Sequence, residues 1–455
     1  MNGTSYRTKE AVLKRAQEAI GIPLGEIDKT GRLRTGKGAV GTTIEESWYG
    51  YAPNSESEPD FPEAGVELKA AAYLQGRTGV RAKERLVCNI INYMEEHDKT
   101  FETSSFWHKC HDLLLLFYRH LDGVPKTAFT IEKALLFQFP PEDLAVIRQD
   151  WETIIGKVRT GQAHLLSEGD TFYLAACTKG ASAKTLREQP FSPLKAKQRA
   201  YSLKASYMTR LLQTYIFGEA QSERVVKDWR DLRQKRFDRY VVEKIAPYTG
   251  MTQAQLQEAL QVHSTAKNLN ELLLAKMLGV RGRIAATEEF RRAQIFPRTV
   301  RVRRDGSIRE SMPFPAFDPV RLSQESIWEQ SVLYEQLAPA RFLFVVFQET
   351  DSGDYVLDRV QFWNIPEADL AEVGRVWERT VQTLKRGVRL TPTPRGVGND
   401  LPKQAESPVA HVRPHGRDGR DTCSLPDGRQ IIKQSFWLNN TYIAQQLRQT
   451  GGLAR

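Results

Sequence analysis

The sequence predicts an α/β protein of two tandem domains, each with a mixed sheet flanked by helices. Short apolar runs typical of buried strands alternate along the chain with segments of helical periodicity. The order of these segments in the first half recurs in the second half, and 455 residues are enough for two separate cores. We therefore expect a first domain at residues 1–220, a helical linker at 221–231 and a second domain at 232–455.

Composition indicates a protein of the cytoplasm with a polyanionic partner. The formal net charge is +10, which favours binding to nucleic acid. The four cysteines form no CxxC pair, so the sequence predicts neither a zinc site nor a disulfide framework. The N-terminus lacks the apolar stretch of a signal peptide, and no apolar run is long enough to cross a bilayer. We expect a soluble, cytoplasmic protein.

Individual elements follow from periodicity and from the glycines and prolines that interrupt it. In the first half, helices are expected at 8–20, 42–49, 101–110 and 141–158, and strands at 67–74, 86–92, 113–118 and 167–178. The second half repeats four features in the same order: 19–27 matches 247–256, 60–71 matches 289–302, 105–117 matches 331–347, and 174–207 matches 411–442. Four matches in one order indicate a duplication.

The main chemical signal is a set of two acids and a lysine, Asp60, Glu67 and Lys69. Side chains alternate between the faces of a strand, so Glu67 and Lys69 project from the same side. A turn after Pro59 can bring Asp60 back to the edge of that strand. Carboxylates bind hard cations such as Mg²⁺, and a lysine can orient water or neutralise charge on a phosphate. The pattern predicts metal-assisted phosphodiester hydrolysis, although a solvated strand edge can carry the same residues.

The second half lacks this set of residues. Phe296 and Arg298 occupy the positions of Glu67 and Lys69, and Glu289 is the acid that remains, at the position of Asp60. Two or more oxygen ligands are needed to hold a divalent cation, whereas the arginines of residues 298–309 suit phosphates. We expect a catalytically inactive domain that still binds DNA.

Taken together, these residues resemble the MutH-type endonucleases, and among them the restriction enzymes with a duplicated domain. The resemblance covers nearly the whole chain. It is carried by Lys37-Gly38, Gly41, Glu45, Asp60-Phe61, Val66-Glu67-Leu68-Lys69, Glu102-Thr-Ser104 and Lys109 in the first half, and by His411-Val-Arg-Pro414 and Phe436-Trp-Leu-Asn439 in the second. It implies two restriction-endonuclease-like domains, of which the first carries a PD-(D/E)xK motif.

The resemblance also implies roles for individual residues. Asp60 and Glu67 would bind Mg²⁺, and Lys69 would activate the attacking water. Glu45 would supply an additional acid, and Lys109 would lie beside the active site. Glu46 is the alternative to Glu45, because an ungapped count back from Asp60 reaches it. The spacing from Gly41 favours Glu45.

Contacts with DNA are implied in both halves. The residues are Lys37, Lys179, Tyr201, Ser202, Lys204, Arg413 and Trp437. MutH-like chains often carry Arg-Pro directly before the lysine that matches Lys179, whereas this chain has Cys177-Thr178 there and Arg-Pro only at 413–414. Which side chain of the first half reads guanine therefore stays open.

The implied activity is that of a type II restriction endonuclease. It would cut double-stranded DNA before the G of GATC and leave 5′-phosphate and 3′-hydroxyl ends. The second domain would bind another GATC copy and stimulate the first, in a monomer that dimerises or forms loops on DNA. A companion DNA methyltransferase would act in the same bacterial cytoplasm.

Two alternatives remain at this stage. The first is a mismatch-repair nicking enzyme, for which a single domain would suffice. The second is a DNA-binding regulator without activity, which would not need the intact set of Asp60, Glu67 and Lys69.

Overall fold

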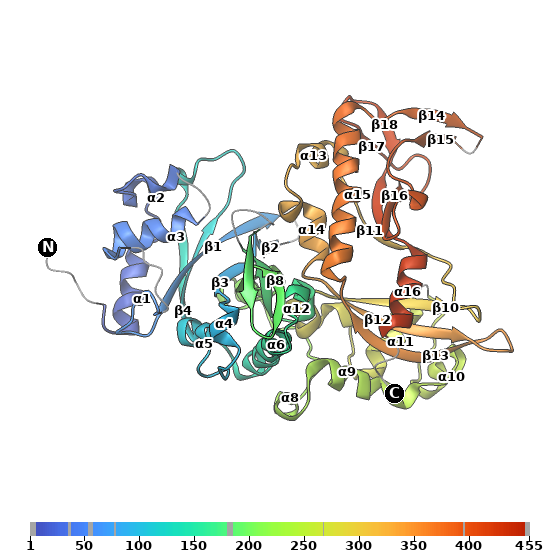
Figure 1. Ribbon diagram of the computed structural model, residues 1–455, viewed down its shortest axis with the longest axis horizontal. Coiled ribbons are helices and arrows are strands. Elements are labelled where there is room, and N and C mark those ends of the chain that lie inside the picture. The colour runs from blue at the N-terminus through green and yellow to red at the C-terminus, as the bar shows by residue number, and fades with distance from the viewer. Residues whose placement is uncertain are drawn as a thin grey trace. The chain divides into compact units, whose positions relative to one another are not determined.

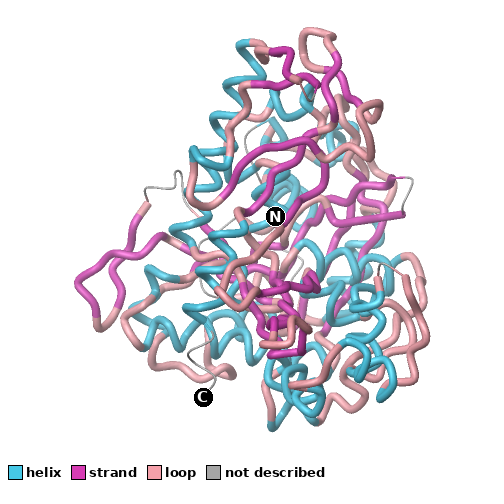
Figure 2. Tube along the Cα trace, turned by 90° about the vertical axis from the view of Figure 1, so that its right-hand side faces the viewer, coloured by secondary structure: helices cyan, strands magenta, loops and turns pink. Residues whose placement is uncertain are grey.

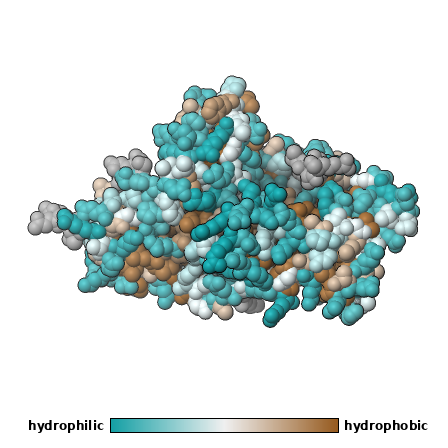
Figure 3. Space-filling view, turned by 90° about the horizontal axis from the view of Figure 1, so that it is seen from below, coloured by the Kyte–Doolittle hydropathy of each residue, from teal (hydrophilic) through white to brown (hydrophobic). Residues whose placement is uncertain are grey.

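The computed structural model describes residues 6–34, 38–52, 58–76, 79–179, 185–266, 268–394 and 396–450. The chain divides into two compact units, the first formed by Met1–Val241 with Leu278–Phe296 and the second by Val242–Met277 with Pro297–Arg455. Each unit contains both helices and strands (Figures 1 and 2), so the predicted α/β class is confirmed. Hydrophilic side chains prevail on the face in Figure 3. No helix in the described ranges has the length and apolar character needed to cross a membrane.

The first unit contains a mixed sheet in the order β2-β1-β4-β5. Its strands are β1 (Glu67–Gly76), β2 (Gly79–Ala82), β4 (Asp112–Arg119) and β5 (Ile131–Gln138). Strand β1 is parallel to β4 and antiparallel to β2. The first six residues of β4 are all buried, which explains its continuous run of leucines.

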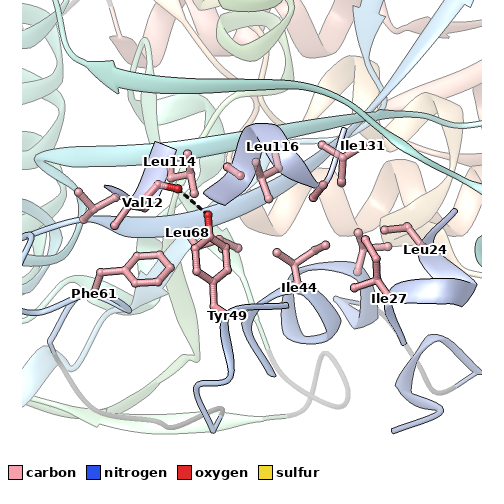
Figure 4. Packing of buried hydrophobic residues seen from close by; sticks show 14 of the residues in the cluster. Val12, Leu24, Ile27, Ile44, Tyr49, Phe61, Leu68, Leu114, Leu116 and Ile131 are labelled. Atoms are coloured by element: carbon pink, nitrogen blue, oxygen red, sulfur yellow. Dashed lines mark hydrogen bonds between the residues drawn. The ribbon is translucent and has the colours of Figure 1, made fainter. Parts of the chain in front are cut away.

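The N-terminal helices cover one face of this sheet. They are α1 (Lys9–Glu18), α2 (Leu24–Ile27), α3 (Ala39–Thr43) and the π-helix η2 (Ile44–Tyr49). Leu114 and Leu116 of β4 pack against Val12 and Ile44 in the core of Figure 4. The Tyr49 hydroxyl donates a hydrogen bond of 2.8 Å to the Val12 carbonyl. This packing fixes η2 beside the strand that carries Glu67.

A second sheet of the first unit has the order β3-β9-β6. Its strands are β3 (Leu86–Ile90), β6 (Leu174–Thr178) and β9 (Arg199–Leu203), and the hairpin of β7 (Leu186–Gln189) and β8 (Ser192–Lys197) lies between β6 and β9 in sequence. The remaining helices are α4 (Tyr93–Glu96), α5 (Ser105–Cys110), α6 (Pro141–Arg159), α7 (Ala205–Leu211), the π-helix η6 (Leu212–Ile216), α8 (Asp231–Gln234) and α12 (Glu288–Ala293). Helix α9 (Phe237–Ile245) spans the boundary of the two units.

The second unit repeats this topology. Its sheets have the orders β10-β12-β13 and β11-β19-β16, which match β1-β4-β5 and β3-β9-β6. The strands are β10 (Ile295–Val302), β11 (Met312–Ala316), β12 (Arg341–Glu349), β13 (Tyr355–Trp363), β14 (Leu390–Thr393), β15 (Gly396–Asn399), β16 (Ala410–Pro414), β17 (Thr422–Ser424), β18 (Gln430–Ile432) and β19 (Gln434–Leu438). The helices are α10 (Gln253–Ala259), α11 (Leu269–Met277), α13 (Pro319–Gln324), α14 (Val332–Leu337), α15 (Glu367–Arg386) and α16 (Asn440–Thr450).

Local details support the duplication. Gly21 and Gly250 both adopt a left-handed φ, of 83° and 87°, and donate their N–H groups to carbonyls of β5 and β13. Ser104 and Ser331 cap α5 and α14, the helices that precede β4 and β12, by accepting a hydrogen bond from the third helical residue. The repeat predicted from four weak sequence matches is thus confirmed by sheet order and by capping.

The predicted boundary between the domains is corrected in two respects. No helix forms at residues 221–230, and α8 begins only at Asp231, so the helical linker at 221–231 is wrong over nearly all of its length. Val225 and Val226 donate their backbone N–H groups to the carboxylate of Glu289 in α12, which replaces the hydrogen bonds of a helix. Helix α12, expected in the second domain, is part of the first unit. Glu289 therefore anchors residues 225–226 to α12.

Candidate active site

Glu67, the first residue of β1, lies at the centre of a charged cluster. Its side chain is 1% exposed. The Nζ atom of Lys69 lies 2.6 Å from Glu67 Oε1, and the Nζ atom of Lys109 lies 3.7 Å from Oε2. The backbone N–H of Asp60 donates to the same Oε2 over 3.1 Å. Asp60, Lys69 and Lys109 therefore all contact the carboxylate of Glu67.

A tight turn holds Asp60 at the edge of β1. Phe61 and Val66 pair as an isolated antiparallel bridge, and Gly65 adopts a left-handed φ of 66° within the turn. The backbone N–H of Leu68 donates to Asp60 Oδ2 over 3.0 Å. Asp60 and Glu67 thus bind each other's backbone segments, and the turn expected after Pro59 is confirmed.

Glu45 faces the same acids from η2. Burial, followed by the negative charges of Asp60 and Glu67, raises the pKa of Glu45 to about 7. Lys109 and Lys69 oppose this shift. A π-helix is an uncommon conformation that often occurs at functional sites. The electrostatic coupling places Glu45 beside the cluster.

Glu46, the alternative acid, is directed elsewhere. It accepts hydrogen bonds from the guanidinium of Arg32 and, over 3.2 Å, from the hydroxyl of Thr30. The hydrogen bond from Arg32 holds the pKa of Glu46 below its ordinary value. The geometry therefore favours Glu45 over Glu46 as the additional acid.

Lys69 carries a proton in this arrangement. Burial lowers its pKa, but the charge of Glu67 outweighs burial, so the pKa of Lys69 lies above its ordinary value. Burial raises the pKa of Glu67, and Lys69 opposes that shift. Lys69 therefore acts here as a cation and hydrogen-bond donor and not as a base.

Two thiols that the sequence analysis treated only as scattered cysteines lie close to Lys69. Cys110 follows Lys109 at the end of α5, and Cys88 belongs to β3. A hydrogen bond with Cys88 and complete burial raise the pKa of Cys110. The only signal in the sequence was that Cys110 directly follows Lys109.

The acids of this cluster fit a hard divalent cation. Among the residues that the structure describes, no three His, Cys, Asp or Glu side chains form a preorganised metal cage. Mg²⁺ usually takes only one or two carboxylates from a protein and completes its shell with waters and phosphate oxygens. Asp60 and Glu67 are adjacent, and after burial their negative charges are the next causes of the raised pKa of Glu45. A cation held by Asp60 and Glu67 would relieve that repulsion.

Three predicted DNA contacts are buried inside the first unit. Tyr201, Ser202 and Lys204 are each at most 2% exposed. The Tyr201 hydroxyl donates to Glu96 over 3.1 Å, and the ammonium of Lys204 donates to the carbonyl of Thr171. Strand β9 is buried along its whole length, so Tyr201 and Ser202 present no surface to DNA in this structure, and their contact with DNA stays a prediction. They hold the second sheet together instead.

The other predicted DNA contacts differ in exposure. Lys179 is exposed directly after β6, whereas Lys37 lies outside the described residues. Arg413 is exposed on β16, and its guanidinium carbon lies 3.8 Å from the ring centre of Trp437. Trp437 itself is only 8% exposed. The tryptophan therefore supports the arginine by a cation–π contact and presents little surface of its own.

Comparisons with known proteins cover both this site and the whole chain. The family model of the DNA mismatch repair enzyme MutH matches residues 49–150, which include Asp60, Glu67, Lys69 and Lys109. The type II restriction enzyme Sau3AI of Staphylococcus aureus is 37% identical over 97% of this chain and 99% of its own length. The chain belongs to the Sau3AI family of type II restriction endonucleases.

Membership of the Sau3AI family also explains the more limited matches. The mismatch repair protein MutH of Shewanella amazonensis is 30% identical over 39% of this chain and 80% of its own length. MutH of Vibrio cholerae is 27% identical over 46% of this chain and 96% of its own length. A MutH protein thus corresponds to less than half of this Sau3AI-family chain, as expected when the fold is duplicated. The predicted restriction-endonuclease fold and enzyme class are confirmed.

Proposed function

We propose that this chain cleaves double-stranded DNA before the G of GATC by Mg²⁺-dependent hydrolysis in its first unit. The observation that carries the proposal is the convergence of Asp60, Lys69 and Lys109 on the buried carboxylate of Glu67. The target sequence comes from the resemblance to the family. Residues 1–220 would contain the catalytic domain, completed by α12 from further along the chain.

The side chains of the cluster have separate roles in this mechanism. Asp60 and Glu67 would hold Mg²⁺, which when bound polarises the scissile phosphate and lowers the pKa of water. Lys69 donates a hydrogen bond to the attacking water, and Lys109 neutralises the charge that develops on the phosphate. Glu45, whose carboxylate is coupled to Asp60 and Glu67, would accept the proton that the water loses.

The reaction is a hydrolysis with in-line geometry. The water oxygen bonds to phosphorus as the bond from phosphorus to O3′ breaks. The leaving O3′ takes up a proton. The products carry a 5′-phosphate and a 3′-hydroxyl, which matches the ends that the family resemblance implies.

The second unit would act as a DNA-binding effector. Its strand β10 carries Phe296 and Arg298 in place of Glu67 and Lys69, while Arg413 remains exposed for phosphate or base contacts. We propose that it binds another GATC copy and stimulates the first unit, in a monomer that dimerises or forms loops on DNA. The enzyme would work in a bacterial cytoplasm in which a companion methyltransferase protects the host's own GATC sites.

The test is plasmid digestion with Mg²⁺ followed by sequencing of the fragment ends. Wild type should give discrete fragments with GATC at every 5′ end, and Lys69→Ala should lower the rate by about 100-fold or more, as expected when one charge-stabilising donor is lost. Lys14→Ala, which removes an exposed lysine of α1, should leave the rate unchanged. Nicked circles without linear products would favour the mismatch-repair alternative. Equal binding without cleavage by both proteins would favour a DNA-binding regulator.

A further inference from the structure

Helix α12 joins the core of the first unit to the first strand of the second. It belongs to the first unit, although residues 242–277 and the chain from Pro297 onward belong to the second. Gln294 ends α12 with a left-handed φ of 54°, and β10 begins at the next residue. In the duplicated topology β10 is the counterpart of the catalytic strand β1.

Buried ion pairs anchor α12 in the first unit. The carboxylate of Glu288 accepts a hydrogen bond from Arg210 of α7 over 2.5 Å, and the guanidinium of Arg292 pairs with Asp143 of α6. The Tyr207 hydroxyl donates to the same Asp143 over 2.9 Å. All four charged side chains are at most 2% exposed. Charges buried in this way are costly to separate, so α12 remains bound to α6 and α7.

A second series of contacts leads from α12 to the catalytic sheet. Arg291 donates to Gln213 Oε1 over 2.9 Å, and Gln213 Nε2 donates to the carbonyl of Val80 over 2.9 Å. Arg210 also donates to Gln213 Oε1, over 2.8 Å. These two donors fix the orientation of the Gln213 amide, because its oxygen must face the arginines and its nitrogen must face β2.

Strand β2 is the element that these contacts reach. It is the edge strand of the catalytic sheet, and Val80 pairs with Gln75 of β1. The backbone N–H of Ala82 donates to the hydroxyl of Thr209 in α7 over 3.0 Å. Side chains of α7 and η6 therefore take the place of a further strand along β2, and their position determines the position of β2.

We infer that α12 transmits the state of the second unit to the active site through Arg291, Gln213 and Val80. DNA bound to the second unit would move β10, and α12 would shift together with α6 and α7 while its buried ion pairs stay intact. The change would pass through the Gln213 amide to β2 and then to β1, whose first and third residues are Glu67 and Lys69. Hydrogen-bonded side chains and rigid elements can carry such coupling when they have two arrangements. The inference rests on the proposed stimulation by a second site and specifies its route.

Two variants of the full-length chain separate this route from a general loss of structure. Arg291→Ala removes the hydrogen bond that α12 donates to Gln213. Gln213→Glu keeps an acceptor for Arg291 and Arg210 but removes the donor to the Val80 carbonyl. Arg233→Ala is a matched control, because it removes an exposed arginine of the first unit that stacks on Trp229 and not on β2.

The measurement is the cleavage rate of a duplex with one GATC, with and without a second GATC duplex that cannot be cut. Coupling between sites typically changes a response by about 5- to 150-fold, so wild type and Arg233→Ala should show stimulation in that range. In Arg291→Ala and Gln213→Glu the stimulation should fall at least about fivefold, with unstimulated rates within about twofold of wild type. Thermal unfolding checks that both variants are folded.

Each outcome bears on the inference. Full stimulation in both variants would overturn the route while leaving the effector role of the second unit intact. Equal loss of the stimulated and unstimulated rates would also overturn it, because the residues would then support only the fold. A wild type without stimulation would overturn the proposed role of the second unit, and this route with it.

Discussion

At the scale of the residue, the acid that we propose as proton acceptor, Glu45, opposes folding at neutral pH. Its pKa is raised from 4.5 to about 7 by burial and by the charges of Asp60 and Glu67. The folded protein therefore holds the Glu45 proton more tightly than the unfolded chain does. The free energy of unfolding consequently falls as the pH rises from 4.5 to about 7 and stays lower above that range. A bound cation would compensate for this cost at the active pH.

Replacing Glu45 by glutamine should therefore separate stability from activity. Without Mg²⁺, Glu45→Gln should raise the free energy of unfolding at pH 8 by on the order of 1–2 kcal/mol and leave it unchanged below about pH 4.5. With Mg²⁺, the same variant should lose most of its cleavage activity. Urea unfolding at both pH values and plasmid digestion measure the two effects.

Glu46→Gln is the matched control for this prediction. Because Glu46 is paired with Arg32 and its pKa is lowered, removing its charge should give no stabilisation at pH 8. It should also leave cleavage close to that of wild type. An equal stability gain for both variants, or a gain for Glu45→Gln that does not depend on pH, would contradict the assignment.

At the scale of elements, three of the five buried residues of α12 are charged. Its short sequence places Glu288, Glu289 and Arg292 among partners from α6, α7 and residues 222–226. Such pairs add little net stability when complete, because burial of each charge costs about as much as the pairing returns. When one member of such a pair is missing, the other is left as an unpaired buried charge, which lowers stability. This is why α12 stays with the first unit, although residues 242–277 and the chain from Pro297 onward do not.

Removing one member of a buried ion pair of α12 should therefore lower the free energy of unfolding strongly. Asp143→Ala leaves the guanidinium of Arg292 buried with one fewer counter-charge, and we expect a loss of about 3–5 kcal/mol in the free energy of unfolding. Lys227→Ala, which breaks an exposed pair with Glu223 in the same unit, should cost less than about 1 kcal/mol. Chemical denaturation of both full-length variants checks the difference. Similar losses for both would show that the buried network is not what anchors α12.

At the scale of the molecule, the compact units do not follow the order of the chain. The first unit needs residues 278–296, which come after 36 residues of the second unit, Val242–Met277. A chain cut near residue 231 would leave Asp143 and Arg210 without Arg292 and Glu288. Deletion of residues 232–455 is for this reason a poor test of regulation, because it also damages the catalytic unit.

Two truncations should show this directly. A chain ending at Val241 should lack a cooperative unfolding transition, because buried charges of α6 and α7 lose their partners. A chain ending at Phe296 retains α12 and should unfold cooperatively. Circular dichroism during heating and limited proteolysis distinguish the two. A cooperative transition at the same temperature in both chains would show that α12 is dispensable for the first unit.

Much of the active site could be predicted because its residues are close in sequence. Asp60, Glu67 and Lys69 lie within one turn and one strand, so local geometry brings them together. Lys109 required the family resemblance, since its approach to Glu67 depends on how α5 packs against the sheet. The choice between Glu45 and Glu46 depended on which side of the π-helix η2 faces the acids.

The sequence by itself determined the α/β class, the duplication, the acidic cluster of the first half and its loss in the second. These features depend on periodicity, spacing and residue type, which act locally. Only the tertiary structure decided that Tyr201, Ser202 and Lys204 are internal and that α12 completes the first unit. Burial and pairing of charges depend on partners far away in the chain, such as Asp143 for Arg292, and no local pattern specifies those partners.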